Sequence, residues 1–180
     1  VRFRRKPEAD LGSFVADTGD IPLVPSVQLA GLEGAVVYGP FSVQSEYMQA
    51  FLGRDGAADL DFNGFYVYGS YFLTGENRVY HRPTGTFGRP RPFENFFWVR
   101  THPASVAAGR GAWELLYRFS YLDLNDGAIA GGTVGNHTVG LNWYLNPYTR
   151  LMCNYLFSTT RRGGLTGEMN IVGMRAQVDF

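Results

Sequence analysis

The sequence predicts an all-β fold, an antiparallel transmembrane β-barrel, and three observations support this. Apolar and polar residues alternate with period two over stretches of about ten residues, the length of a tilted strand that crosses a bilayer. Aromatic residues recur at one end of these stretches, and the chain stops on an aromatic, Phe180. In the last stretch Val172 and Met174 alternate with Gly173 and Arg175, so a strand there has one apolar and one polar face.

Earlier segments repeat this alternation and set the number of strands. Together with a short first strand within 1–21, they give about eight strands. The expected strands cover residues 27–38, 41–52, 62–73, 111–124, 135–145, 149–160 and 170–180. We interpret them as part of a single barrel domain over residues 1–180.

The connections predict which strand ends share a level. Antiparallel neighbours run in opposite directions, so counting strands back from Phe180 assigns each strand end to one of two levels. We call the level that contains Phe180 the lower level and the opposite one the outer level. Segments 53–61, 125–134 and 161–169 are rich in Gly, Asp and Asn, and the count places these turns at the outer level.

The connection 74–110 is long, Pro-rich and lower by the same count. It carries six arginines against two glutamates. A structureless connection of this length is unusual. Either residues 95–100 form a short strand or helix, or the strand direction differs upstream of residue 111.

The alternation assigns side chains to a polar face, which lines the lumen in a wide barrel. The residues expected to line a pore are Glu46, Glu114, Arg118, Asn142, Arg150, Asn154, Arg175, Gln177 and Asp179. For Arg118, Arg150 and Arg175, pairing with opposite charges along the wall and guidance of ions both remain open.

Aromatic residues converge at the lower level, as an interfacial girdle of amphipathic rings requires. The expected membrane-interface aromatics are Tyr38, Phe41, Trp113, Trp143, Tyr148 and Phe180, and Tyr144 falls at the same level.

Composition excludes several classes. The chain has no run of about 18 apolar residues, so it is not a helical membrane protein. Its net charge is zero, which argues against nucleic-acid binding. Cys153 is the one cysteine, and the three histidines lack metal-ligand spacing; we expect no metal, cofactor or catalytic residue. The start at Val1 lacks a signal peptide, so we expect a fragment or a mature portion.

Several blocks resemble the C-terminal half of the phosphate-selective porins O and P. They are VYGPFSVQSEY at 37–47, LTGE at 73–76 followed by Arg78 and Tyr80, GAWEL at 111–115, GLNWYLN at 140–146 and RAQVDF at 175–180. The resemblance implies an outer-membrane barrel of roughly 16 strands, trimeric when complete, through which small anions such as phosphate diffuse. It also implies that Phe180 is a signal for the barrel-assembly machinery.

Two other function classes stay open. A soluble or small barrel could hold a small apolar ligand, because about eight strands also suit a closed calyx. An outer-membrane lipid hydrolase would use a lipid-facing base, and His137 has that parity, with Thr159 and Tyr121 as its expected neighbours.

Overall fold

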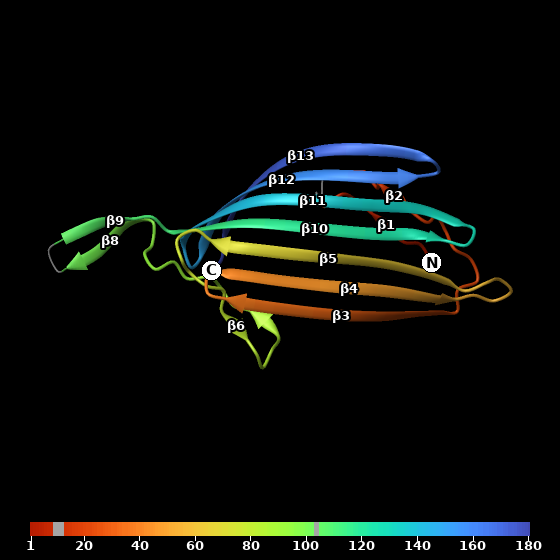
Figure 1. Ribbon diagram of the computed structural model, residues 1–180, viewed down its shortest axis with the longest axis horizontal. Coiled ribbons are helices and arrows are strands. Elements are labelled where there is room, and N and C mark those ends of the chain that lie inside the picture. The colour runs from red at the N-terminus through yellow and green to blue at the C-terminus, as the bar shows by residue number, and fades with distance from the viewer. Residues whose placement is uncertain (9–12, 103–104) are drawn as a thin grey trace.

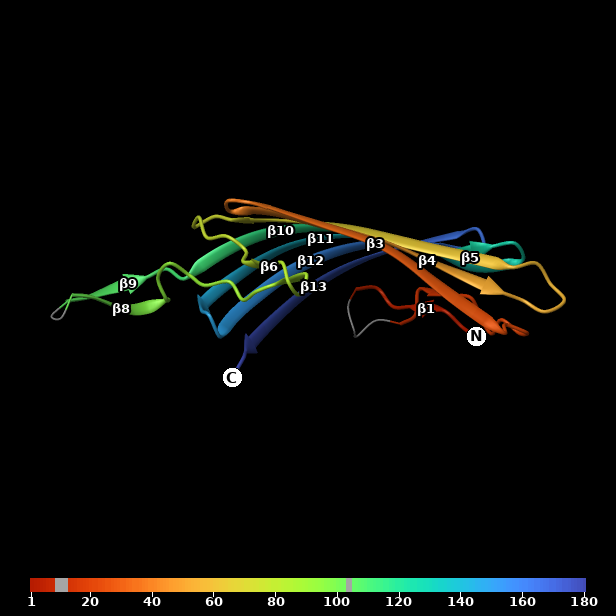
Figure 2. The same cartoon turned by 90° about the horizontal axis from the view of Figure 1, so that it is seen from below.

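The computed structural model describes residues 1–8, 13–102 and 105–180, the side chains of 98–107 excepted. These residues form thirteen strands. Seven of them make one antiparallel sheet in the order β13-β12-β11-β10-β5-β4-β3 (Figure 1). The sheet is long and curved, with a concave and a convex side (Figure 2).

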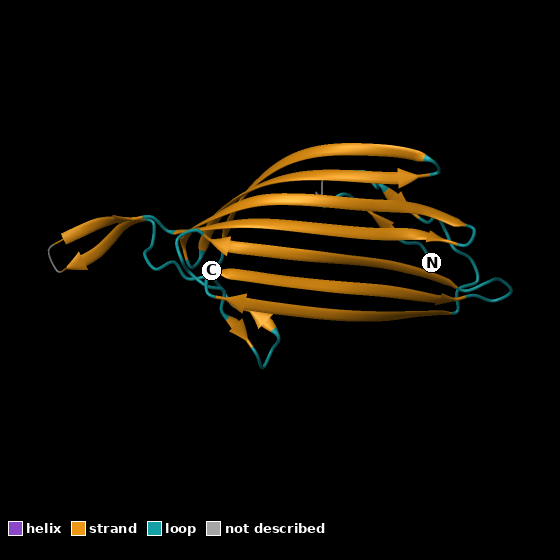
Figure 3. Ribbon diagram, in the orientation of Figure 1, coloured by secondary structure: helices purple, strands orange, loops and turns teal. Residues whose placement is uncertain are grey.

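The strands of this sheet confirm the seven long strands expected from alternation. They are β3 (Ser26–Tyr38), β4 (Phe41–Gly53), β5 (Leu60–Phe72), β10 (Ala112–Asp126), β11 (Ile129–Asn146), β12 (Thr149–Arg162) and β13 (Leu165–Val178). Each pairs with its neighbour in antiparallel register. Short loops join the neighbouring strands of the sheet, except between β5 and β10, where the connection is long (Figure 3).

Two of the expected outer loops are shorter than predicted. The strands β10 to β11 and β12 to β13 are joined by the residue pairs 127–128 and 163–164, whereas alternation predicted loops over 125–134 and 161–169. The strands continue beyond their apolar stretch because cross-strand pairing persists there, from Asp126↔Ile129 in one hairpin and from Arg162↔Leu165 in the other. Backbone pairing needs no hydrophobic pattern, so alternation alone underestimates these strands.

The N-terminal segment does not supply the eighth strand that the sequence predicted. Its strands β1 (Arg4–Arg5) and β2 (Ala16–Asp17) pair with each other and lie on the concave side of the large sheet (Figure 2). Ala16 and Ile21 are buried there in a cluster with side chains of β4, β5, β10 and β11. Burial of this apolar surface holds the segment across the sheet instead of at its edge.

The long connection after β5 lies at the lower level, as the strand count predicted, because β5 and β10 are antiparallel neighbours. It contains two hairpins, β6 (Tyr80–His81) with β7 (Thr86–Phe87) and β8 (Phe97–His102) with β9 (Ser105–Gly109). Strand β8 confirms the prediction of a short element within 95–100. The β8–β9 hairpin projects past the end of the sheet at the left of Figure 1.

The sheet is open in the described chain. Strands β3 and β13 are its two edges and do not pair with each other, so a closed barrel is not formed by these strands. The described residues include no helix of the length and hydrophobicity that crossing a membrane requires.

Candidate functional site

The two faces of the large sheet differ in chemistry, and the strand register shows which residues share a face. One row across four strands joins Glu114, Asn142, Met152 and Arg175. The adjacent row joins Leu115, Leu141, Cys153 and Met174. The first row is on the concave side, because Arg78 from the connection that lies there bonds to Glu114. The concave face is therefore the polar one.

Most of the residues expected to line a pore lie on this concave face. By register they are Glu46, Glu114, Arg118, Asn142, Arg150, Asn154, Arg175 and Gln177. Asp179 follows the end of β13, where its backbone N–H donates to the Tyr148 carbonyl at 2.8 Å.

The concave face holds a hollow of about 1030 Å³. Its lining combines polar and apolar side chains of β10–β13 with Tyr66 and Tyr68 of β5 and with Glu8 of the N-terminal segment. Four of the expected residues line it, Arg118, Asn142, Asn154 and Arg175. The lining also contains apolar side chains, among them Leu116, Met152 and Leu156, so the hollow is mixed in character. The described strands do not close around it as the calyx alternative requires, because β3 and β13 remain the edges of an open sheet.

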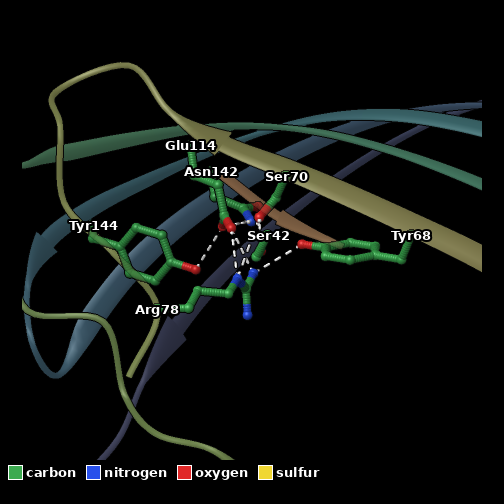
Figure 4. A network of polar contacts seen from close by, with 7 residues as sticks. All are labelled: Ser42, Tyr68, Ser70, Arg78, Glu114, Asn142 and Tyr144. Atoms are coloured by element: carbon green, nitrogen blue, oxygen red, sulfur yellow. Dashed lines mark hydrogen bonds and ion pairs between the residues drawn. The ribbon is translucent and has the colours of Figure 1, made fainter. Parts of the chain in front are cut away.

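A polar network occupies the lower end of the concave face (Figure 4). Arg78 comes from the connection after β5, and its Nε and Nη2 donate to Glu114 Oε1 at 3.0 and 2.5 Å. Its Nη2 also donates to the Tyr68 hydroxyl at 2.8 Å, and its Nε reaches Ser70 Oγ at 3.3 Å. One arginine thereby ties a connection to two neighbouring strands of the sheet.

Glu114 is the centre of this network and is fully buried. Its second oxygen, Oε2, accepts from Asn142 Nδ2 at 2.8 Å and from the Tyr144 hydroxyl at 2.9 Å. Burial lowers the pKa of the Arg78 guanidinium, but the Glu114 carboxylate raises it, and the net direction is upward. Arg78 therefore stays charged, and the buried pair is a permanent one.

Arg118 and Arg150 have partners along the wall. Arg118 lies 3.3 Å from the Glu8 carboxylate and 4.5 Å from the centroid of the Tyr66 ring. The Arg150 Nη2 donates to Gln177 Oε1 at 2.8 Å. Arg118 thus pairs with a carboxylate and Arg150 with an uncharged amide, and these contacts orient both guanidinium groups on the concave face.

The lower aromatics lie where the strand count placed them. Trp113 and Trp143 stack on the convex face with ring centroids 4.8 Å apart, and Phe96 packs against Trp143 at 4.6 Å. Tyr144 lies at the same level, and its position on the polar face of β11 directs its ring inward to Glu114. Its hydroxyl donates a hydrogen bond to the buried Glu114 carboxylate, which would otherwise lack this partner.

The remaining aromatics of the expected girdle are exposed at the same end. Tyr38 and Phe41 pair across the tight β3–β4 turn, and both are exposed. Tyr148 lies in the β11–β12 turn under the Arg89 guanidinium, 4.8 Å from it. Phe180 is fully exposed at the end of the chain.

The residues directly opposite His137 are not the two neighbours that the sequence suggested. Its cross-strand partners are Phe119 and Phe157, and its Nδ1 lies 2.8 Å from the Tyr117 hydroxyl. Thr159 and Tyr121 pair instead with Gly135, which lies two residues before His137 on the same face of β11. These contacts give the hydrolase hypothesis no support.

Sequence reasoning missed the roles of Arg78 and Glu8. Both belong to segments outside the large sheet and reach the concave face only through tertiary contacts. The available signal was a lone glutamate, Glu114, at an inward position near a strand end, which needs a cation as its partner.

The fold and the site define a class: all-β proteins built as an antiparallel meander with a polar concave face and an apolar convex face. Within it, the chain belongs to the phosphate-selective porin O and P family, whose model matches residues 1–180. Porin O of Pseudomonas aeruginosa is 32% identical over 141 residues, which cover 72% of this chain and 29% of that protein.

A protein of Caulobacter vibrioides without an assigned function is also similar. It is 32% identical over 188 residues, which cover 100% of this chain and 36% of that protein. The chain thus spans about a third of the length of these relatives.

Proposed function

We propose that this chain forms part of the wall of an outer-membrane channel through which small anions such as phosphate diffuse passively. The observation that carries the proposal is the concave polar face with its hollow of about 1030 Å³, opposite a convex apolar face. Membership of the porin O and P family supports it. Diffusion through a lumen requires no catalytic residue and no cofactor.

The seven strands are proposed to be one side of a closed transmembrane barrel. A strand edge with unpaired backbone groups is not tolerated in hydrocarbon, and both β3 and β13 have such an edge here. Pairing of these edges with further strands would close the barrel. A wide barrel of this family would leave a water-filled lumen over the concave face.

The expected polar residues are proposed to line that lumen. Arg118, Arg150 and Arg175 offer planar guanidinium groups, which suit phosphate because each can donate two parallel hydrogen bonds. The carboxylates Glu8 and Glu114 already pair with Arg118 and Arg78. Selectivity for anions would then come from arginine donors that remain free beside these pairs.

The convex face is proposed to contact outer-membrane lipid. The exposed rings of Tyr38, Phe41 and Tyr148 and the stacked pair Trp113–Trp143 lie at one end of the strands, where amphipathic rings favour a membrane–water interface. Phe180 is proposed to be read by the barrel-assembly machinery. The resemblance further supports a homotrimer of the full-length protein.

Electrical recording from the full-length protein in planar bilayers tests the proposal. We expect discrete current steps and, across a potassium chloride gradient, a reversal potential of the sign that chloride permeation produces. Added phosphate should reduce the chloride current, because both anions use the same arginines. Absence of steps, or a reversal potential of the opposite sign, would reject an anion channel.

A further inference from the structure

The connection between β5 and β10 begins with a set of contacts that fix its path. The Trp113 backbone N–H donates to Thr74 Oγ1 at 3.0 Å, and the Thr74 hydroxyl donates to Glu76. The Phe93 backbone N–H donates to Glu76 Oε1 at 3.1 Å. Glu76 is buried, so the start of the connection and residue 93 are held together next to the end of β5.

Between these points, Arg78 forms the first anchor of the β6–β7 hairpin to the sheet. Its guanidinium pairs with the fully buried Glu114 and bonds to Tyr68 and Ser70. A buried carboxylate without a cation is strongly unfavourable, so Arg78 is held tightly at this point. The hairpin starts one residue later on the chain, at Val79, whose carbonyl accepts from the Gly88 N–H at 2.7 Å.

Arg89 forms a second anchor on the far side of the hairpin. Its Nη2 lies 3.6 Å from Asp179 Oδ2, and its guanidinium lies 4.8 Å from the centroid of the Tyr148 ring. Both groups of this ion pair are more than a third exposed, so this anchor is the weaker one. A small hollow of about 240 Å³ separates the two anchors.

The hairpin itself extends away from the sheet on its concave side. Tyr80 and Phe87 pack edge to face across it at 5.4 Å, and its tip is exposed. In Figure 2 the hairpin lies on the concave side, and in Figure 1 it extends beyond the β3 edge. In a closed barrel, that direction leads across the lumen at its lower mouth.

We propose that Glu114 is a positioning residue that holds the β6–β7 hairpin across the lower mouth of the channel through Arg78. The inference rests on the proposed channel function. The hairpin narrows the mouth, and Glu114 controls the size of the opening without touching the permeating ion. Because the pair is buried inside the wall, the hairpin keeps its position while ions pass.

Single-channel conductance of the full-length protein tests this. Glu114→Gln keeps the side chain's size but removes the charge that holds Arg78, and we expect a conductance increase on the order of twofold as the hairpin leaves the mouth. Glu168→Gln is the matched control, since it removes the same charge from an exposed position at the outer end of β13, on the convex face by register and away from the hairpin. The control should leave conductance unchanged. Arg78→Lys, which keeps the charge, should give an intermediate increase.

A thiol at the hairpin tip tests the position directly. Thr84 is exposed and lies between the two short strands. In a Cys153→Ser background, Thr84→Cys modified by a bulky charged methanethiosulfonate should reduce the current, and addition of Glu114→Gln should abolish most of that reduction. The first result needs no change to Glu114, so it tests the position of the hairpin even if Glu114→Gln does not assemble. Arg78→Lys, combined with Thr84→Cys, then tests the anchor.

The outcomes separate this inference from the function on which it rests. If the unaltered protein forms no channels, the proposed function fails. If it forms channels but the modified Thr84→Cys does not reduce the current, the hairpin does not lie in the mouth. If modification reduces the current equally with and without the Glu114→Gln substitution, Glu114 does not position the hairpin.

Discussion

Two segments lie on the concave face of the sheet, one at each end, and they are held there by different forces. The N-terminal segment at the outer end is held by an apolar cluster that includes Ala16 and Ile21. The Glu8–Arg118 ion pair adds a further contact. The connection at the lower end is held by the buried Arg78–Glu114 pair and its hydrogen bonds.

The two anchors differ in their sensitivity to single substitutions. An apolar cluster distributes its stabilisation over many contacts, so loss of one side chain removes only a share of it. A buried ion pair concentrates the stabilisation in two groups, and loss of one leaves the other charged and without a partner. The lower anchor fixes the position of its segment through two groups, so a single substitution should disrupt it more than it disrupts the apolar cluster.

The largest effect should follow from Arg78→Leu. Glu114 would stay buried without its cation, and the expected loss of stability is about 3–5 kcal/mol. Urea unfolding of the full-length protein in lipid vesicles, followed by tryptophan fluorescence, measures this. Arg82→Leu, at the exposed hairpin tip, serves as the control and should have almost no effect. Equal midpoints for both variants would show that the buried pair contributes little.

The apolar anchor should respond to Ile21→Ala. Ile21 is 1% exposed, and its truncation should cost about 2–5 kcal/mol of the packing that holds the segment. The expected readout is local, namely faster proteolysis of residues 1–25 with the sheet still intact. The same change at exposed Leu23 should not matter. If Ile21→Ala leaves proteolysis unchanged, another contact holds the segment.

Substitutions at two neighbouring residues of β11 test which face of the sheet contacts lipid. Val139→Arg, on the exposed convex face, should cost about 2–4 kcal/mol if it lies at the bilayer midplane. Thr138→Arg, on the concave face beside Glu8, should be tolerated. Unfolding in vesicles compares the two. The opposite ranking would exchange the lipid and lumen faces.

The second anchor of the hairpin should matter little for stability. Arg89→Gln breaks an exposed ion pair with Asp179, and such pairs contribute about 0–1 kcal/mol. The urea midpoint should shift slightly, and less at high salt concentration. A shift as large as that of Arg78→Leu would contradict the ranking of the two anchors.

The smallest effect on stability is expected for Phe180→Ser. Phe180 is fully exposed in the chain, so its loss removes no packing within the described structure. Membrane assembly in cells should nevertheless be impaired while synthesis continues, as fractionation with immunoblotting measures. Normal assembly of the variant would remove the proposed recognition of Phe180.

The sequence predicted the regular part of the molecule because local alternation encodes it. Strands such as β10 and β11 have one apolar and one polar face, and their parity placed Arg118 and Asn154 on the face where the structure has them. The strand count also placed the long connection at the lower level.

The rest depends on contacts between residues far apart in the chain, which alternation does not contain. Arg78 and Glu114 are 36 positions apart, and Glu8 and Arg118 belong to opposite parts of the sequence. Alternation placed Tyr144 on the polar face and at the correct level, but its bond to Glu114 could not be predicted for the same reason. The sequence therefore could not predict that the hairpin and the N-terminal segment lie on the concave face.

The most direct test of the account is thiol accessibility at two adjacent positions of β12 in the full-length protein within a bilayer. The native Cys153 lies on the convex face, and Asn154 lines the concave hollow. A hydrophilic methanethiosulfonate should leave Cys153 unmodified and the current unchanged. In the Cys153→Ser background, Asn154→Cys should react and reduce the current. Reaction at Cys153 with no reaction at Asn154→Cys would contradict a polar lumen on the concave face.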